Sequence, residues 1–169
     1  NVFAGYAAIE GRMANVVIAD EPAPANHVAI SLDGFRTLGI VPALGRGFLP
    51  EEYRRGSDNV VVVTDDFWRT RLHADPAVLD REILIDQQSC KVVGVLRPGQ
   101  LIPFRFQGDV YRPLFFELGP RDRFGPGIHV VGRLRPGVSP EVARAALATV
   151  QFPSLPQIQA SSIAEREPV

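Results

Sequence analysis

Asp65 and Asp66 are the first residues whose types and spacing suggest chemistry, because paired carboxylates can bind a metal ion or act as acid and base. They follow Val60–Val63 and Thr64, an order that is typical of a capped helix, whose dipole favours negative charge in the first turn. Neighbouring side chains on a helix point apart. We therefore interpret the pair as helix-capping carboxylates, and the charged segment 51–55 as a solvated loop.

The three histidines and the single cysteine also lack the spacing of a site. His27, His73 and His129 fall in separate predicted elements, and none has a histidine partner four residues away, so no zinc motif is present. We expect each imidazole to be exposed or hydrogen bonded. Cys90 cannot form a disulfide within the chain, and although Lys91 could lower the pKa of its thiol, we expect a structural role.

The glycine patterns of three familiar enzyme sites are absent. The sequence contains neither of the phosphate-binding patterns GxxxxGK[ST] and GxGxxG, and it lacks the nucleophile pattern GxSxG. We therefore predict no catalytic residue, no cofactor and no metal, and we expect that the chain is not an enzyme. A hydrolase whose active-site residues are dispersed along the sequence stays open as an alternative.

The segment Leu101–Phe106 contains the one candidate contact surface. Phe104, Arg105 and Phe106 combine two aromatic side chains with an arginine in a predicted loop. This composition is enriched at protein interfaces. An equally good interpretation is that the loop folds its aromatic side chains into the core.

The overall composition is that of a globular chain with many turns. Its 169 residues suffice for one domain or two small lobes, with 46% hydrophobic and 22% charged residues and a net charge of −1. This balance excludes a nucleic-acid binder that works by bulk positive charge. No stretch is apolar over the length needed to cross a membrane. Because the chain begins at Asn1 without methionine, we expect it to be a piece of a longer protein.

Hydrophobic patterning predicts strands at both ends of the chain and in a compact middle unit. Within residues 3–19 we predict two strands separated by a turn at Gly11-Arg12. Residues 20–24 contain two prolines and are predicted as a connector, followed by a strand over His27–Leu32. Val60–Val63 is apolar without alternation, which is typical of a strand in the middle of a sheet.

Capping signals predict three further helical segments. Asp33 and Gly39 mark the start and end of a short helix, Asp75-Pro76 repeats a capped start, and Ser139 begins the clearest helix. A last short strand is predicted at 157–163. The apolar stripe of the clearest helix is formed by Val142, Ala146 and Val150.

Two near-identical segments raise the question of an internal repeat. Val92–Gly99 and Val130–Gly137 read VVGVLRPG and VVGRLRPG. There is no third copy, so we interpret each as a strand that ends in a Pro-Gly turn, not as a duplication. The first of them belongs to a predicted hairpin, in which Glu82–Ile85 and Cys90–Val95 flank a turn at 86–89.

Six segments, in order, carry a likeness to a known family. They are Phe35–Phe48 (FRTLGIVPALGRGF), Val60–Val63 with the following Phe67-Trp68-Arg69, Asp75–Val78, Val92–Val95, Asp109–Leu114 and Val131–Ser139. The series resembles the MacB-like periplasmic core domain of ABC-transporter permeases, in particular the acidobacterial type, and covers residues 3–150.

The resemblance implies an α+β fold of two lobes. A porter-like βα lobe would be built from both chain ends, residues 1–40 and 121–169, and a small α/β lobe, residues 41–120, would be inserted between them. The first strand and helix of the family domain are expected to lie outside this sequence. The chain departs from the family pattern at the glycine-free turn Asp86-Gln87-Gln88, at Leu32-Asp33-Gly34 and at Pro153, which ends the last helix early.

The resemblance also implies a non-catalytic domain on the periplasmic side of the bacterial inner membrane, as part of an integral membrane permease. The domain would transmit conformational change and contact substrate or a partner. Its partners would be the transmembrane helices of the same polypeptide, a cytoplasmic ATPase reached indirectly and, as an option, a second copy in a homodimer. Besides the hydrolase, a soluble module that binds a small ligand or peptide is the alternative.

Overall fold

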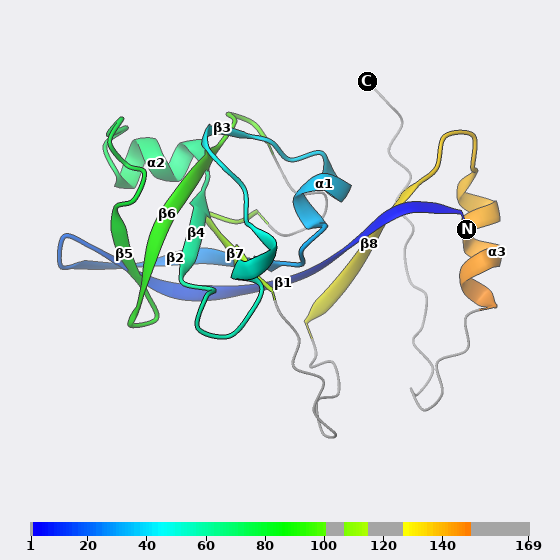
Figure 1. The fold of residues 1–169 in the computed structure, drawn as a ribbon, viewed down its shortest axis with the longest axis horizontal. Helices are drawn as coiled ribbons and strands as arrows, with labels where there is room; N and C mark the ends of the chain where they lie inside the picture. Colours follow the sequence, from blue (N-terminus) through cyan, green and yellow to red (C-terminus); the bar gives the residue numbers. More distant parts are fainter. Residues whose placement is uncertain (1, 101–106, 115–126, 150–169) are drawn as a thin grey trace.

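The computed structural model describes residues 2–100, 107–114 and 127–149, which form an α+β fold with one mixed sheet and few helices (Figure 1). This is the predicted class, whereas the division into two lobes, 1–40 with 121–169 and 41–120, stays a prediction. The predicted strand at 157–163 lies outside the described residues. The strands are β1 (Phe3–Ile18), β2 (Glu21–Ile30), β3 (Pro42–Gly45), β4 (Val60–Val63), β5 (Glu82–Ile85), β6 (Gln88–Leu96), β7 (Val110–Pro113) and β8 (Ile128–Leu134). The helices are α1 (Gly34–Leu38), α2 (Asp65–Arg71) and α3 (Pro140–Ala148), with a 3-10 turn at Pro50–Glu52.

Six of the strands close into a ring. β1 pairs with β2, β2 with β7, β7 with β4, β4 with β6, β6 with β5, and β5 returns to β1. The closing contact is short, because only Ile85 and Leu84 of β5 pair with Val16 and Val17 of β1. β3 and β8 lie outside the ring, on β6 and on the N-terminal half of β1.

Two apolar cores lie on opposite faces of this sheet. The inner core takes side chains from all six ring strands and from α2, including Val16, Ala25, Val63, Phe67, Leu72, Ile85, Val92 and Val110. The outer core is packed against by α1 and includes Ile9, Ile30, Val62 and Tyr111, with Phe35 and Leu38. Because every ring strand contributes to the inner core, we place that core on the enclosed face of the ring.

The two strands predicted within residues 3–19 are in fact one strand, β1, and the predicted turn at Gly11-Arg12 is wrong. Both of these residues pair with β2. Alternate residues of a strand face opposite sides. Ala7 and Ile9, at odd positions, enter the outer core, whereas Ala14 and Val16, at even positions, enter the inner core. The apolar residues change from odd to even positions where β1 passes from one core to the other, and in the sequence this change resembles a break between two strands.

Residues 20–24, predicted as a connector, lie mostly in β2. Pro22 and Pro24 are placed opposite β1. Proline cannot donate to a ladder and is tolerated where no second neighbour needs its N–H. β7 pairs with β2 only from His27 onward, so the prolines have no strand on their other side among the described residues. The chain reverses at Ala19 and Asp20, whose φ angles are 49° and 66°.

Three local predictions in the middle of the chain are confirmed. β4 lies between β6 and β7, with three of its four valines fully buried. Thr64 caps α2, since its hydroxyl oxygen accepts a hydrogen bond from the N–H of Phe67 at 3.2 Å. The β5–β6 hairpin forms, with a tighter turn than predicted. Asp86 and Gln87 both adopt positive φ, 49° and 69°, as a two-residue type I′ turn requires, although neither is glycine.

Two of the predicted helix caps are wrong. Asp33 makes no side-chain capping bond and instead accepts a hydrogen bond from Arg36 at 2.8 Å, although Gly39 ends α1 in the left-handed region as predicted. Asp75 starts a turn rather than a helix, and its carboxylate accepts the N–H of Ala77 at 2.8 Å.

Ser139 caps α3 as predicted, but the expected apolar stripe does not mark the buried side of this helix. The Ser139 hydroxyl accepts the N–H of Val142 at 3.4 Å. Val142 and Leu147 are exposed, whereas Ala143 is buried. Val150 lies outside the described residues.

Two glycines allow the backbones of β3 and β6 to approach closely. A Cβ at Gly94 would lie 2.3 Å from the carbonyl oxygen of Arg46, and a Cβ at Gly45 would lie 2.2 Å from that of Val93. Gly45 also has a φ of 66°, which favours glycine.

We predict that Gly94→Ala destabilises the fold by about 2–3 kcal/mol or more, because the clash is with backbone and cannot be relieved by a side-chain rotation. The free energy of unfolding, measured by urea denaturation, checks this. Gly56→Ala is the control: Gly56 has a φ of 84° but nothing within 4 Å of its Cβ position, so only about 1 kcal/mol of conformational cost is expected. Equal losses in the two variants would contradict the close-approach argument.

Candidate functional site

The acidic residues singled out in the sequence do not form a shared site. Asp65 is buried and accepts a hydrogen bond from Nε of Arg69 at 2.7 Å, whereas Asp66 is exposed. The capping interpretation of this pair therefore fits the structure. The segment 51–55 is not all solvated, because Glu52 is buried and receives two hydrogen bonds from Arg46, at 2.7 and 2.9 Å. This ion pair fixes the loop between β3 and the 3-10 turn.

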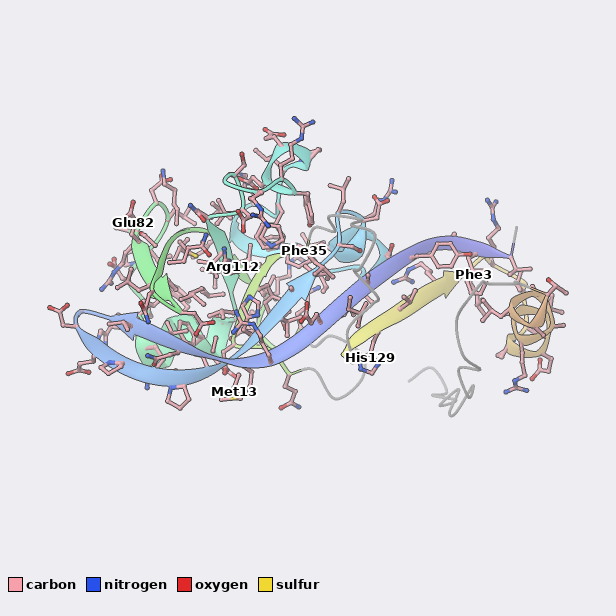
Figure 2. All side chains as sticks on the ribbon, turned by 90° about the horizontal axis from the view of Figure 1, so that it is seen from below. Phe3, Met13, Phe35, Glu82, Arg112 and His129 are labelled. Atoms are coloured by element: carbon pink, nitrogen blue, oxygen red, sulfur yellow. The ribbon has the colours of Figure 1, made fainter. Side chains whose placement is uncertain are left out.

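Charged side chains gather instead at one end of the ring. We call this cluster the polar mouth: Arg12, His27, Asp58, Asp86 and Arg112. Arg12 on β1 forms an ion pair with Asp86 in the β5–β6 turn. Arg112 on β7 donates to the carbonyl and carboxylate oxygens of Asp58, at 3.0 and 3.3 Å, and Figure 2 shows it among the ring strands. Each guanidinium has a carboxylate, so the two ion pairs leave the polar mouth without net charge.

Asp86 ties the closing contact of the ring together. Its Oδ1 accepts the N–H of Asn15 at 2.8 Å, its own N–H donates to the carbonyl of Asn15 at 2.9 Å, and its Oδ2 accepts from Arg12. The backbone N–H of Asn15, followed by the Arg12 guanidinium, holds the pKa of Asp86 below its ordinary value. The carboxylate is exposed, so we assign it a geometric role, fixing the turn on β1, rather than a large electrostatic one.

His27 is the unusual member of the polar mouth. It is 6% exposed, and neither of its ring nitrogens has a hydrogen-bond partner among the described residues. Burial, and after it the charges of Arg12 and Arg112, lowers the pKa of His27 from 6.5 to about 4. The expectation of an exposed or hydrogen-bonded imidazole is therefore wrong for His27. Nε of Arg112, whose residue is 8% exposed, also has no partner within the described part of the chain.

The other histidines and the cysteine do not join this cluster into a metal or catalytic site. His73 is exposed in the turn after α2, and His129 lies on β8. The described residues contain no group of three or more histidine, cysteine, aspartate or glutamate side chains that could hold a metal ion. Cys90 is buried in the inner core, and burial raises the pKa of its thiol. This agrees with the predicted structural role and not with activation by Lys91.

The candidate contact surface lies outside the described residues. Phe104, Arg105 and Phe106 fall in the segment 101–106, on which the structure gives no information. Their assignment as a contact surface stays a prediction.

A second feature joins the ring to its extension. β1 continues past the ring and pairs with β8, and the two form a ribbon that reaches toward α3 (Figure 1). Thr37 of α1 donates its hydroxyl to the carbonyl of Tyr6 on β1 at 3.1 Å, and its own carbonyl accepts Nε of Arg133 on β8. We call these three residues the α1 seam. A Cβ at Gly5 would lie 2.8 Å from the Thr37 hydroxyl oxygen, so the helix sits directly on the ribbon.

The α1 seam is favourable for two physical reasons. The guanidinium of Arg133 meets the C-terminal end of α1, where the helix dipole favours a positive charge. The helix is also held from its other side, because the ring of Phe35 packs on Phe48 and Tyr111 at centroid distances of 5.3 and 6.1 Å. α1 therefore contacts the ribbon and the outer core of the ring at once.

Comparison with protein families assigns the chain. The model of the family described as MacB-like periplasmic core domain matches residues 4–150. The chain belongs to this family. The match confirms the resemblance found in the sequence. No curated protein matches the chain, and no helix among the described residues is long and apolar enough to span a membrane.

Solved structures of periplasmic and extracellular transporter domains share the fold of this MacB-like domain. The periplasmic region of MacB from Actinobacillus actinomycetemcomitans matches with a TM-score of 0.66 and 17% identity, over 87% of this chain and 65% of that one. The extracellular domain of the ABC-type transporter YknZ from Gram-positive bacteria matches with a TM-score of 0.55 and 15% identity, over 67% of this chain and 56% of that one. A domain of a putative permease from Porphyromonas gingivalis matches with a TM-score of 0.59 and 15% identity, over 86% of this chain and 62% of that one. The chain thus spans less than two thirds of each of these structures.

Sequence reasoning missed both the polar mouth and the α1 seam. His27 and Arg112 were separately visible, as a histidine in an alternating strand and an arginine between apolar residues. Their meeting depends on the parallel pairing of β2 with β7, which no local pattern encodes. Thr37 and Arg133 are 96 residues apart. The signal that could have indicated them is an alignment of related sequences in which such distant positions vary together.

We predict that Cys90 is inert in the folded domain. At pH 8 its alkylation by iodoacetamide is expected to be at least about 100-fold slower than in urea, because both burial and the raised pKa suppress the thiolate. Mass spectrometry measures the rate. In the control variant Ser89→Cys with Cys90→Ala, the thiol stands at an exposed neighbouring position and should react in the folded state. Rapid labelling of Cys90 in the folded wild type would contradict its burial in the inner core.

Proposed function

We propose that this MacB-like domain is the non-catalytic periplasmic domain of an ABC-transporter permease and that it transmits conformational change between the membrane and a substrate or partner. In this proposal the transmembrane helices belong to the same polypeptide, a cytoplasmic ATPase acts through them, and a second copy forms a dimer. The family match supports the setting. The single observation that carries the mechanical role is the continuity of β1.

β1 supports transmission because one unbroken strand belongs to two structures. Its 16 residues pair with β8 in the ribbon at one end and with β2 and β5 in the ring at the other. Where the ribbon meets the ring, Ile9 and Glu10 pair with β8 on one side and with β2 on the other, and pairing on both sides resists bending at this junction. A displacement of the ribbon is therefore passed to the ring without a hinge in β1.

The α1 seam supports the same role by bracing the junction. Ser31 after β2 also bonds to Ala8 of β1, and Val131 of β8 packs on the outer core. The seam adds resistance to a twist of the ribbon about the strand axis. Arg133 links β8 to α1 and Thr37 links α1 to β1. Because α1 also packs on the outer core, the seam makes a three-sided brace around the junction.

The contact role is proposed for Phe104, Arg105 and Phe106. An aromatic pair with an arginine is suited to a protein partner or an amphipathic substrate. This residue-level assignment rests on composition alone and is separate from the mechanical proposal, so either can fail without the other.

We predict that Arg133→Ala uncouples the ring from the ribbon in the parent permease assembled with its ATPase. Fluorescent labels at Val130 on β8 and at Glu82 on β5 report the approach of each part to a quencher on lipid headgroups. In wild type, ATP is expected to change quenching at both positions together. In Arg133→Ala the two responses should separate, because the lost charge-assisted hydrogen bond is worth about 1.5–3 kcal/mol.

Arg36→Ala is the matched control, because Arg36 lies on the same helix and its side chain pairs with Asp33 in an exposed position, away from the ribbon strands. It should behave as wild type. Joint responses in Arg133→Ala would rule out the seam as the brace. If ATP changed quenching at neither position in wild type, the transmission proposal itself would be wrong.

A further inference from the structure

The polar mouth contains a buried base that no acid among the described residues hydrogen bonds. His27 lies on the enclosed face of β2, directly opposite Arg12 of β1. On the other side, β2 pairs with β7, where His27 stands opposite Val110 and Arg112 follows two residues on, toward the same face. A protonated imidazole at this position would therefore have a guanidinium on each side.

The carboxylates near His27 offset these two cations only in part, because Asp86 raises the pKa of His27 less than burial and the two guanidinium groups lower it. Asp86, from the β5–β6 turn, is engaged by Arg12 and by the N–H of Asn15. Asp58, before β4, is engaged by Arg112. Cys90, from β6, is in the inner core with its pKa raised, so its thiol is neutral at ordinary pH. Neither ring nitrogen of His27 has a hydrogen-bond partner within the described residues. A proton added to the imidazole would therefore find no acceptor there.

We propose that His27 is an acid-responsive switch, which keeps β2 closed on β7 while the imidazole is neutral and releases β2 locally when the imidazole is protonated. The released strand carries His27 out to water, where the cation is solvated. Nothing in this proposal depends on the transport role of the domain.

The β2–β7 contact is the pairing of the ring that holds His27 beside Arg112. It consists of four residue pairs in parallel arrangement, ending at Pro113, which has no N–H to donate. Parallel pairing is slightly weaker per residue than antiparallel pairing. β2 also pairs with β1 along ten positions in an antiparallel hairpin. The hairpin can therefore stay intact while β2 parts from β7.

The direction of the pH effect follows from the two protonation equilibria. The pKa of His27 is about 4 when the mouth is closed and 6.5 when the imidazole is solvated. The open state therefore binds the proton more tightly, and closure is favoured above pH 6.5 and is progressively lost as the pH falls toward 4. Between pH 7.5 and pH 5 the opening equilibrium constant is expected to rise about 30-fold.

Hydrogen exchange of the native protein at pH 7.5 and pH 5, corrected for the intrinsic pH dependence of exchange, tests this. Amides of β2 and β7 around His27 and Arg112 should lose protection by about 30-fold, while those of β4 and β6 change much less. In His27→Gln, whose side chain is neutral at both pH values, the selective loss should disappear. His73→Gln, at an exposed histidine, should retain it.

Three results would overturn the switch. The first is equal protection of β2 and β7 at both pH values in wild type, and the second is a selective loss that persists in His27→Gln. The third is a loss spread evenly over all strands, which indicates global unfolding rather than local release. Should His27→Gln fail to fold, an NMR titration of wild type decides: a pKa below about 5 for His27 supports the switch, and any higher value refutes it.

Discussion

The structure depends on the requirement that β1 complete two pairings at once. Its C-terminal half must meet β5 to close the ring, and its N-terminal half must hold β8. The closing contact is only two residue pairs long, so it needs the additional bonds that Asp86 makes to Asn15 and Arg12. The inner core, the polar mouth and the position of the ribbon all follow from that closure, because each is defined by which face of β1 is enclosed.

Local patterns predicted what is decided locally. The Thr64 cap, the buried strand β4, the end of α1 at Gly39 and the start of α3 at Ser139 each depend on a few neighbouring residues. The errors occurred where tertiary contacts override the local pattern. Two prolines lie in a strand because that strand has no neighbour on one side within the part of the chain that the structure describes. In the same part of the chain, a buried histidine has no hydrogen bond because distant strands enclose it.

The candidate sites differ in the same way. The sequence predicted the family, and the family match over residues 4–150 confirms it. The sequence also lacks a recognisable motif for catalysis. It did not predict the polar mouth or the α1 seam, since both are formed by residues brought together from separate strands. Arg112 is an example: between Tyr111 and Pro113 it has the appearance of an ordinary strand residue, and only the ring explains why a charged side chain is buried there.

Within β1 the buried apolar residues change from odd to even positions, and this change limits how the segment can vary in length. Deleting a single residue between Ile9 and Ala14 would exchange inward and outward positions at one end of the strand, turning one core's side chains toward solvent. Deleting two residues would keep every side chain on its proper face and shift only the register. Natural variation in the length of this stretch should therefore occur in steps of two, and an odd step should require a compensating bulge.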